Sequence, residues 1–304
     1  MLTYFQAIVM GLLQGVTELF PISSLGHSVL FPTLFGWHNL IRAQSQPESF
    51  YLAFIVGLHV GTAFGLFVFY RRDWVKIVGG LVTSARHRRI DTPDERLGWL
   101  LVVATIPAGL TGLLLEHKLR VLFSKPLSAA IFLMVNGLIL LTGELVRRRQ
   151  LTRRLAPSEA ATATRHLAVS DRDAPAIKQL DHLAFGESFV IGLAQVAALI
   201  AGISRSGITM VAGLVRGLDH EDTARFSFLL ATPIILAAGV LKLPDLFGTL
   251  GNGIRGQVLA GSAAAGVAAY FSARFLIRWF QTRTLWPFAI YCLVVGFAFT
   301  IYYS

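Results

Sequence analysis

Residues 9–26 read VMGLLQGVTELFPISSLG, and residues 190–207 read VIGLAQVAALIAGISRSG. An ungapped comparison at this offset of 181 residues pairs seven identical residues, among them a glutamine, a serine and two glycines. Such residues seldom coincide by chance between apolar segments, and similarity at one fixed offset is the signature of an internal repeat. The sequence therefore predicts a chain built from two duplicated halves.

The composition of the 304-residue chain is that of a membrane protein. Hydrophobic residues make up 54% of it and charged residues 14%, whereas a soluble domain carries about 25% charged residues. The charges are clustered, and the apolar stretches between the clusters are long enough to cross a bilayer core of about 30 Å. These features exclude a soluble enzyme, a disordered chain and a secreted disulfide scaffold. The single cysteine, Cys292, allows neither an intramolecular disulfide nor a cysteine-based metal site.

Both halves have the same plan, a hairpin of two apolar segments followed by three membrane spans. Because each half crosses the membrane an odd number of times, the second starts on the opposite side, as in many transporter folds. The predicted fold is therefore all-α: a polytopic integral membrane protein of two inverted-topology repeats, each with a re-entrant helical hairpin and three transmembrane helices. The predicted boundaries are a first repeat at 1–146 (hairpin 3–37, spans 50–70, 98–115 and 127–146), a basic cytoplasmic linker at 147–183, and a second repeat at 184–304 (hairpin 184–216, spans 224–242, 254–273 and 286–302).

Basic residues mark one side of this arrangement. Of the 27 Lys and Arg residues, 20 lie in the hydrophilic stretches 71–97, 147–183, 216–225 and 274–285. Cytoplasmic loops are rich in Lys and Arg, so we expect these stretches in the cytoplasm and both termini outside it. The net charge of +10, which would suggest a nucleic-acid partner for a soluble protein, is assigned to this topology, and no nucleic acid is expected. Arg205 differs from the other basic residues because it lies inside an apolar region.

The two repeated hairpins also carry the polar residues of the apolar segments. Gln14 and Glu18 are four residues apart and share one helix face, before Pro21 breaks the helix. Gly202 breaks the helix at the equivalent place in the second hairpin. The polar residues that follow the two breaks are Ser23, Ser24 and His27 in the first hairpin and Ser204, Arg205, Ser206 and Thr209 in the second.

An ionisable residue inside a membrane segment is costly and usually functional, and Glu18 and Arg205 are the clearest cases. If the hairpins are re-entrant, both tips reach the middle of the membrane, where the two side chains share one site. Both tips also begin a helix, and a helix N-terminus attracts anions through its free N–H groups and its dipole. Arg205 adds a bidentate donor for phosphate. The residues therefore predict an anion site, with phosphate as the favoured anion.

These motifs resemble those of the undecaprenyl-diphosphate phosphatase (bacitracin resistance) family. Gln14-x3-Glu18 followed by Pro21-Ile-Ser-Ser-Leu-Gly-His27 resembles its first signature, and the residues 202–209, Gly-Ile-Ser-Arg-Ser-Gly-Ile-Thr, resemble its second. Weaker similarities follow in order along nearly the whole chain, at 58–62, 104–107, 226–231 and 287–291.

The resemblance implies hydrolysis of undecaprenyl diphosphate to undecaprenyl phosphate and inorganic phosphate, which recycles the lipid carrier for cell-wall polymers and confers bacitracin resistance. It also implies a multi-pass protein of the bacterial cytoplasmic (inner) membrane whose site opens outward. The expected partners are the isoprenyl diphosphate substrate, the bilayer and, in a homodimer, a second copy of the chain. The alternative is a transporter or flippase for isoprenyl phosphate or another anion, because inverted repeats with broken helices are typical of transporters.

Four residues depart from the family pattern. Ala201 stands where the second signature has a proline, and Arg225 where an acidic residue often precedes Phe-Ser-Phe-Leu-Leu. Cys292 replaces an arginine, and Gln14 replaces the first of two carboxylates. The change at Gln14 weakens any mechanism that needs two acidic metal ligands on this helix.

The expected catalytic residues are Glu18, Ser24, His27 and Arg205. Arg205 is expected to bind phosphate, with a structural ion pair to Glu18 as the alternative. Glu18 is a candidate general acid or base, metal ligand or orienter of His27. Ser24 is slightly favoured as the nucleophile, activated by His27 or Glu18, while His27 as nucleophile or as proton donor to the leaving group stays open. Expected substrate contacts, with capping or polar packing as alternatives, are Gln14, Ser23, Ser204, Ser206 and Thr209.

A divalent cation, Mg²⁺ or Ca²⁺, is expected to bridge Glu18 and the substrate diphosphate. The hairpins offer too few carboxylates for a cage made by the protein alone, so substrate oxygens and water would complete the ligand shell. His59 is expected to be a satisfied buried histidine rather than a residue that lines the cavity.

Overall fold

The computed structural model describes residues 2–44, 46, 49–123, 125–155, 178–248 and 251–304, and within these ranges its secondary structure is helical, without strands. Six of the described helices are long and apolar enough to cross a membrane, which confirms the predicted all-α, polytopic fold class. Their apolar sections are Phe50–Phe69, Pro93–Leu114, Pro126–Gln150, His220–Leu241, Arg255–Phe280 and Trp286–Tyr303.

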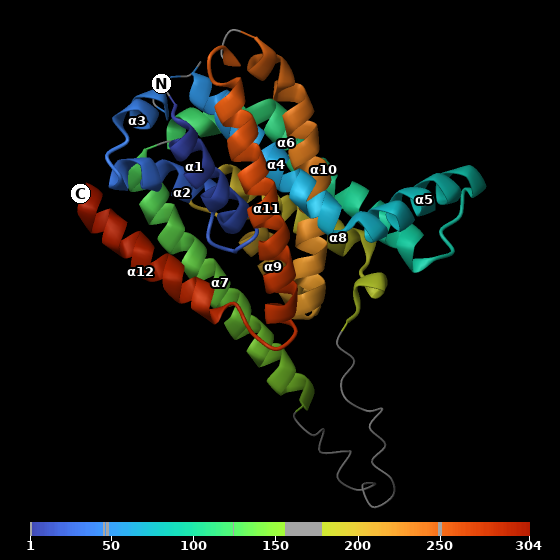
Figure 1. Ribbon diagram of the computed structural model, residues 1–304. Coiled ribbons are helices and arrows are strands. Elements are labelled where there is room, and N and C mark those ends of the chain that lie inside the picture. Colours follow the sequence, from blue (N-terminus) through green and yellow to red (C-terminus); the bar gives the residue numbers. More distant parts are fainter. Residues whose placement is uncertain (1, 45, 47–48, 124, 156–177, 249–250) are drawn as a thin grey trace, which may run out of the picture.

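Figure 1 shows the helices coloured along the chain. Two helices, α1 and α2, form the first hairpin, and α8, η3 and α9 form the second. In chain order the elements are α1 (Tyr4–Thr17), α2 (Ser24–Leu34), α3 (His38–Gln44), α4 (Phe50–Phe69), α5 (Arg71–His87), α6 (Pro93–Phe123), α7 (Pro126–Leu155), η2 (Leu180–His182), α8 (Phe185–Ala194), η3 (Gln195–Leu199), α9 (Arg205–Val215), α10 (His220–Phe247), α11 (Arg255–Phe280) and α12 (Trp286–Tyr303).

The helices of the two hairpins are shorter than a bilayer core is thick. Helix α1 has 14 residues and α9 has 11. At 1.5 Å per residue these helices are about 21 and 17 Å long, which is short of a bilayer core of about 30 Å. In Figure 1, α1 begins beside the N label and ends at mid-height of the bundle. The lengths therefore support re-entrant hairpins whose tips lie inside the membrane.

Each hairpin turns where the sequence predicts a break, at Pro21 and at Gly202. After the first turn Ser23 has a φ of 70°, which is unusual for a residue with a side chain, and its Oγ accepts a hydrogen bond from the Gly26 N–H at 3.2 Å. In the second turn Gly202 has a φ of 106°, which glycine adopts without a steric cost. Ser204 caps α9 in the same way, through Oγ and the N–H of Gly207 at 3.1 Å.

Equivalent glycines let each hairpin pack closely against the opposite half. A β-carbon at Gly11 of α1 would lie 2.2 Å from the Gly261 carbonyl oxygen of α11, and one at Gly192 of α8 would lie 2.1 Å from the Ala104 carbonyl oxygen of α6. Gly11 and Gly192 are 181 residues apart and are identical in the repeat. Since α11 and α6 are each the second span of their halves, the two contacts correspond, which fits the predicted inverted repeat.

The contacts between the two hairpin tips also involve equivalent residues of the repeat. A β-carbon at Gly26 would lie 3.3 Å from the Gly202 α-carbon, and one at Gly207 would lie 3.3 Å from the Pro21 β-carbon. Each helix start therefore sits on the turn of the other hairpin. Large side chains of the spans, such as Phe54 of α4, Leu133 of α7 and Phe228 of α10, are fully buried, so the tips lie in a packed interior.

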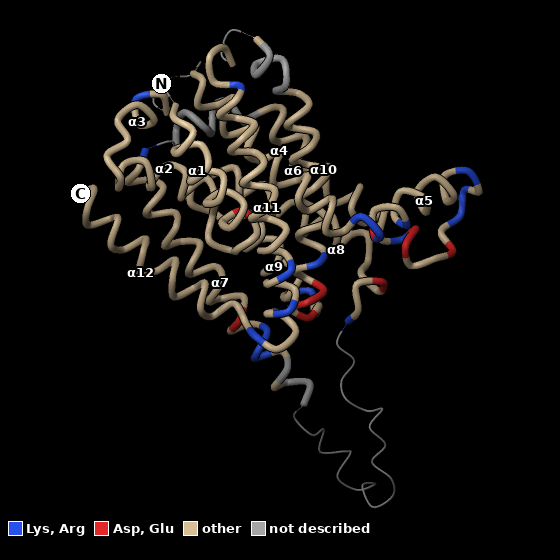
Figure 2. The backbone as a smooth tube through the Cα atoms, viewed as in Figure 1, with Lys and Arg blue, Asp and Glu red and all other residues tan. Residues whose placement is uncertain are grey.

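Basic residues lie mainly at one end of the molecule, as the basic loops predict. Figure 2 shows Lys and Arg gathered at the lower end of the bundle and along α5, while the N and C labels lie at the other end. The amphipathic helix α5 occupies most of the stretch 71–97, for which the sequence analysis predicted only a basic loop. Helix α7 extends nine residues beyond the predicted span end at 146, to Leu155. Of the predicted linker 147–183, residues 156–177 lie outside the described residues.

Alanine in place of Gly11 or Gly192 should lower the thermal stability of the purified protein in detergent. The added methyl group would overlap a carbonyl oxygen, and overpacking of this kind costs about 1–3 kcal/mol. Gly112→Ala is the matched control because nothing lies within 4 Å of its added β-carbon. Equal melting temperatures for G11A, G192A and G112A would contradict the close helix packing.

Candidate active site

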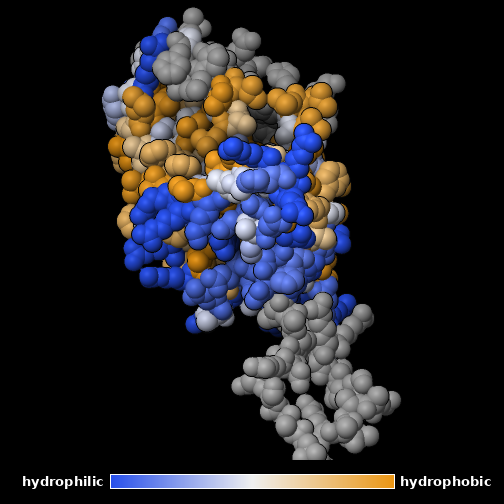
Figure 3. All heavy atoms as spheres, turned by 90° about the vertical axis from the view of Figure 1, so that its right-hand side faces the viewer, coloured by the Kyte–Doolittle hydropathy of each residue, from blue (hydrophilic) through white to orange (hydrophobic). Residues whose placement is uncertain are grey.

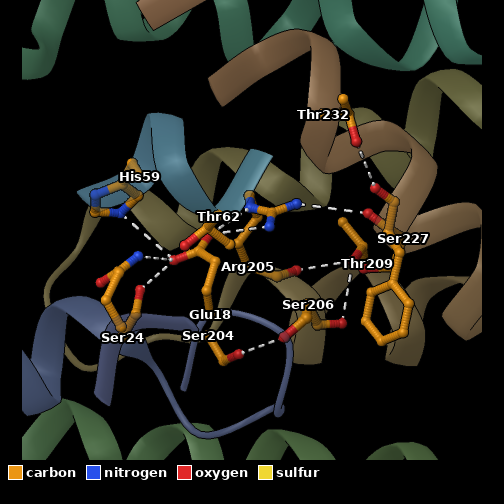
Figure 4. A network of polar contacts seen from close by, with 12 residues as sticks. Glu18, Ser24, His59, Thr62, Ser204, Arg205, Ser206, Thr209, Ser227 and Thr232 are labelled. Atoms are coloured by element: carbon orange, nitrogen blue, oxygen red, sulfur yellow. Dashed lines mark hydrogen bonds and ion pairs between the residues drawn. The ribbon is translucent and has the colours of Figure 1, made fainter. Parts of the chain in front are cut away.

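Glu18 is the centre of a polar network at the first hairpin tip. It follows the last residue of α1 and is 6% exposed. Its Oε2 accepts a hydrogen bond from Gln14 Nε2 at 3.0 Å and another from the Ser24 hydroxyl. Its Oε1 accepts from Arg205, at 2.9 Å from Nη2 and 3.3 Å from Nε. Figure 4 shows these side chains converging on the carboxylate, and the predicted meeting of Glu18 and Arg205 is confirmed.

Ser24 and Arg205 hold equivalent positions in the two halves, 181 residues apart. Each is the first residue of its helix, α2 or α9. Both side chains bind Glu18, but on different oxygens. Two helix N-termini therefore begin at the same carboxylate, beside a guanidinium and a hydroxyl, which is the arrangement that the sequence predicted for an anion site.

His59, on α4, also reaches the carboxylate. Its Nε2 lies 3.4 Å from Glu18 Oε2, and its side chain is 21% exposed. Its Nδ1 donates to the Ile55 carbonyl oxygen at 2.8 Å, so a proton on Nε2 as well makes the ring an imidazolium beside the carboxylate. Both ring nitrogens therefore have partners, as expected of a satisfied histidine, and one of these partners is the central carboxylate of the network (Figure 4).

His27 lies close in sequence but binds elsewhere. Its Nδ1 is 2.7 Å from the Ser23 carbonyl oxygen, and its Nε2 is 2.8 Å from the Tyr291 hydroxyl on α12. The two rings also stack, with centroids 5.8 Å apart. Both ring nitrogens are thus engaged with groups other than Ser24 and Glu18, and the sequence analysis did not single out Tyr291 as a partner.

The predicted substrate-contact hydroxyls join the second hairpin to its neighbours. Ser204 and Ser206 have their hydroxyl oxygens 3.0 Å apart, and Ser206 donates to the Phe20 carbonyl oxygen at 3.2 Å. The Thr209 hydroxyl lies 2.6 Å from that of Ser227 on α10. In this conformation these hydroxyls do not contact Glu18, and Ser23 and Ser204 cap helices.

The equivalent glutamines have different surroundings. Gln14 donates to Glu18, whereas the buried Gln195 side chain has no hydrogen-bond partner in the described part of the chain. They do not form the polar pair between hairpins that was one alternative in the sequence analysis.

Asn136, on α7, ties the two hairpin tips together and was missed by the sequence analysis. Its side chain is fully buried. Its Nδ2 donates to the Pro21 carbonyl oxygen at 2.9 Å, and its Oδ1 accepts from the Ser204 N–H at 2.9 Å. One amide thereby satisfies a backbone acceptor of the first tip and a backbone donor of the second.

Two departures from the family pattern have structural partners. Cys292 Sγ lies 3.3 Å from Asn136 Nδ2, so this thiol packs behind the tips in place of an arginine. Arg225 Nη2 donates to Asp73 Oδ1 of α5 at 2.6 Å. The reversed charge at Arg225 is therefore compensated outside the site.

The residues around Glu18 fit a cation that arrives with the substrate. Groups of three or more His, Cys, Asp or Glu side chains that could hold a metal do not occur among the described residues. Glu18 and His59 form a pair of ligand-type groups at the hairpin tips, 3.4 Å apart. Because Mg²⁺ is commonly held by one or two carboxylates together with substrate phosphates and water, one carboxylate is sufficient for such an ion.

Comparison with known proteins gives matches over nearly the whole chain. The family described as bacitracin resistance protein BacA matches residues 7–298. Undecaprenyl-diphosphatase 2 of Frankia alni is 53% identical, with 100% of this chain and 98% of that protein covered. The undecaprenyl-diphosphatases of Mycolicibacterium paratuberculosis and Mycobacterium avium are each 57% identical, with 97% of this chain and 95% of theirs covered.

Asn136→Ala should destabilise the protein because it leaves the Pro21 carbonyl oxygen and the Ser204 N–H without their buried partner. Each unsatisfied buried group costs about 1–3 kcal/mol. Thr142→Ala, on the same helix, is the control because it removes only a hydrogen bond to Leu138 at an exposed position. Thermal unfolding in detergent would measure both, and a shift no larger for N136A than for T142A would contradict the bridge.

Proposed function

We propose roles for individual residues on the premise that this chain belongs to the bacitracin resistance protein BacA family and is an undecaprenyl-diphosphate phosphatase. It hydrolyses undecaprenyl diphosphate to undecaprenyl phosphate and inorganic phosphate, which recycles the lipid carrier for cell-wall polymers. It is a multi-pass membrane protein, and the transporter alternative is not favoured. The observation that carries the residue roles is the single carboxylate shared by Ser24 and Arg205.

In the proposed first step, Ser24 attacks the terminal phosphorus of the diphosphate. The Ser24 Oγ–P bond forms and the bond from phosphorus to the bridging oxygen breaks, which releases undecaprenyl phosphate. Glu18 takes the Ser24 proton, since its Oε2 already accepts that hydrogen bond. The leaving group departs as a phosphate and needs no proton at this stage.

In the second step, water attacks the phosphorus of phosphoserine. The P–Oγ bond breaks, Glu18 returns its proton to Ser24 Oγ, and the protons of the water remain on the released inorganic phosphate. One carboxylate therefore accounts for every proton, which suits a site where Gln14 stands in place of the first carboxylate of the family pattern.

Arg205 binds the transferred phosphoryl group in this proposal. Its guanidinium is held by Glu18 in the structure, and the more highly charged diphosphate would compete for it. The N-termini of α2 and α9 add backbone N–H groups and the positive ends of two helix dipoles. His59 lies within reach of Glu18, and its neutral ring would leave Nε2 free for the cation proposed below, because Nδ1 is engaged with the Ile55 carbonyl oxygen.

His27 is a positioning residue in this scheme. It donates from Nδ1 to the Ser23 carbonyl oxygen and so supports the positive-φ conformation of Ser23, which sets the position of Ser24. A phosphohistidine on His27 is the competing scheme. Trapping the phosphoenzyme and locating the phosphate would separate the two.

We also propose that Mg²⁺ or Ca²⁺ enters with the diphosphate. Glu18 and His59 would hold it, and the ion would neutralise charge on the phosphate oxygens. The finer localisation is proposed as well: the bacterial inner membrane, with both termini extracytoplasmic and the site opening outward. The support is the basic end opposite the N and C labels (Figure 2) and the positive-inside rule. A homodimer stays a prediction.

Arg205→Ala, Glu18→Gln and Ser24→Ala should each reduce phosphate release from undecaprenyl diphosphate by purified protein in detergent, by about 10²-fold or more. Arg225→Lys is the control, because that arginine pairs with Asp73 and does not touch Glu18. Undiminished release from R205A would contradict the phosphate-binding role, and full release from S24A with phosphate trapped on His27 would contradict the proposed nucleophile.

Chelation with EDTA should abolish phosphate release, and added Mg²⁺ or Ca²⁺ should restore it. Because His59 contacts the proposed ligand Glu18, His59→Ala should raise the metal concentration needed for half-restoration roughly tenfold, while R225K should not change it. Release that persists after exhaustive chelation would contradict a required divalent cation.

A further inference from the structure

Helix α5 has an exposed apolar stripe for which the bundle provides no cover. Val75, Val78 and Val82 are 74%, 52% and 64% exposed. Their spacing of three and four residues places them within an arc of about 60° around the helix, at about 100° per residue. A contiguous apolar face of this kind indicates contact with another apolar phase. In Figure 1 the helix projects from the side of the bundle, and the exposure of the three valines shows that the bundle does not cover this face.

Basic residues occupy the neighbouring arc of the same helix. Arg72, Lys76 and Arg86 are exposed and lie over about 80° of the helix circumference, directly beside the valines. The opposite face packs inward through Ile77, which is 1% exposed, and Ser84. An apolar stripe bordered by basic residues is the pattern of a helix that lies in the membrane interface among anionic headgroups.

A groove continues this surface toward the membrane interior. It has a volume of about 420 Å³, and α5 contributes Trp74, Ile77 and Leu81 to its wall. Most of the remaining wall runs along α6 from Gly98 to Leu113, a distance of about 22 Å at 1.5 Å per residue, and Pro233 of α10 completes it. Among the lining residues only Thr105 carries a hydroxyl, and this hydroxyl donates a hydrogen bond within α6 to the Leu101 carbonyl oxygen. The groove therefore offers a narrow, apolar path of the length of a lipid chain.

We propose that α5 and this groove form a binding site for an anionic phospholipid of the cytoplasmic leaflet. One hydrocarbon chain lies in the groove between α5 and α6, and the valines rest on the surrounding acyl chains. Arg72 and Lys76, one helical turn apart, bind the phosphate of the headgroup, while Arg86, about 15 Å farther along the helix than Lys76, meets the headgroups of neighbouring lipids. Figure 3 looks at this side of the molecule and shows the hydrophilic lower part meeting an apolar upper part, as a helix at the interface requires.

The occupant is a phospholipid rather than the isoprenyl substrate because of where the two sites face. The groove begins at α5, at the basic and hence cytoplasmic end, whereas the proposed active site opens outward. The substrate diphosphate is also matched by Arg205 and two helix N-termini, which the groove lacks. This proposal rests on the membrane topology and not on the residue roles in catalysis.

The first test locates α5 relative to lipid in nanodiscs that contain the full-length chain. A fluorophore is attached to V78C, with T83C, in the basic arc, as the matched control; the native Cys292 is buried, and unmodified protein shows its background labelling. Lipids with brominated acyl chains should quench the V78C fluorophore at least about twofold more than the T83C fluorophore, since one faces acyl chains and the other headgroups. Equal quenching at both positions would overturn the interfacial placement.

The second test asks for the anionic headgroup. When about one lipid in ten is brominated, brominated phosphatidylglycerol should quench the V78C fluorophore more than brominated phosphatidylcholine does. This headgroup preference should fall roughly tenfold in the R72Q/K76Q/R86Q variant, since each basic residue near an anionic surface contributes appreciable binding. The triple variant R274Q/R278Q/R283Q removes the same charge elsewhere on the cytoplasmic side and should retain the preference. No headgroup preference, or equal loss in both triple variants, would overturn the proposal.

The groove is tested by filling it. Gly109 lines the groove and Gly112 does not, and a β-carbon at either would have nothing within 4 Å. Gly109→Leu should therefore weaken phosphatidylglycerol binding while Gly112→Leu leaves it unchanged, with phosphate release retained in both. Two results would overturn the phospholipid as occupant. One is that undecaprenyl phosphate displaces phosphatidylglycerol at a lower concentration than phosphatidylglycerol itself needs to bind. The other is that the V78C fluorophore is shielded from brominated lipid only in discs that hold two copies of the chain.

Discussion

A carboxylate inside a membrane has to be compensated, and the arrangement of this protein follows from how Glu18 is compensated. Moving an isolated charge into a medium of low polarity is so unfavourable that the charge persists only with close partners. Glu18 has a guanidinium on one oxygen and an amide, a hydroxyl and an imidazole on the other. These partners come from both hairpins and from α4, so the carboxylate holds together segments from both halves of the chain.

Duplication supplies the geometry of the site, and divergence supplies its chemistry. Two equivalent hairpins bring two helix N-termini to one place, each with a serine cap at the equivalent position. The next residue has diverged, to Ser24 in one half and Arg205 in the other. A symmetric site would hold two hydroxyls or two cations, whereas phosphoryl transfer needs a nucleophile and a charge acceptor side by side. The repeat therefore produces complementary groups from equivalent backbone positions.

The sequence was sufficient for the parts of the structure that depend on pattern and polarity. The all-α membrane fold and the meeting of Glu18 with Arg205 follow from apolar lengths, helix breaks and two charges inside apolar segments, and the structure also fits the predicted inverted repeat with re-entrant tips. The contributions of His59 and Asn136 did not follow, because each lies within a long apolar span whose pattern does not show which of its polar residues faces the hairpin tips. Which way such a span is rotated depends on packing, here through close approaches such as that of Gly61 to Ser262. Their polarity was the available signal, since Asn136 is a lone amide within its predicted span.

The ion pair between Glu18 and Arg205 does not have to be either structural or functional. A buried pair is held together most strongly when nothing else can satisfy its members, and removal of one member leaves an expensive charge. In the proposed mechanism the substrate changes that condition because it brings phosphate oxygens for the arginine and a proton-transfer task for the carboxylate. The pair that joins the hairpin tips would then be the pair exchanged on binding, with the cost of its separation offset by the contacts of the diphosphate. The ion pair that preorganises the site is thus also the contact that joins the two hairpin tips.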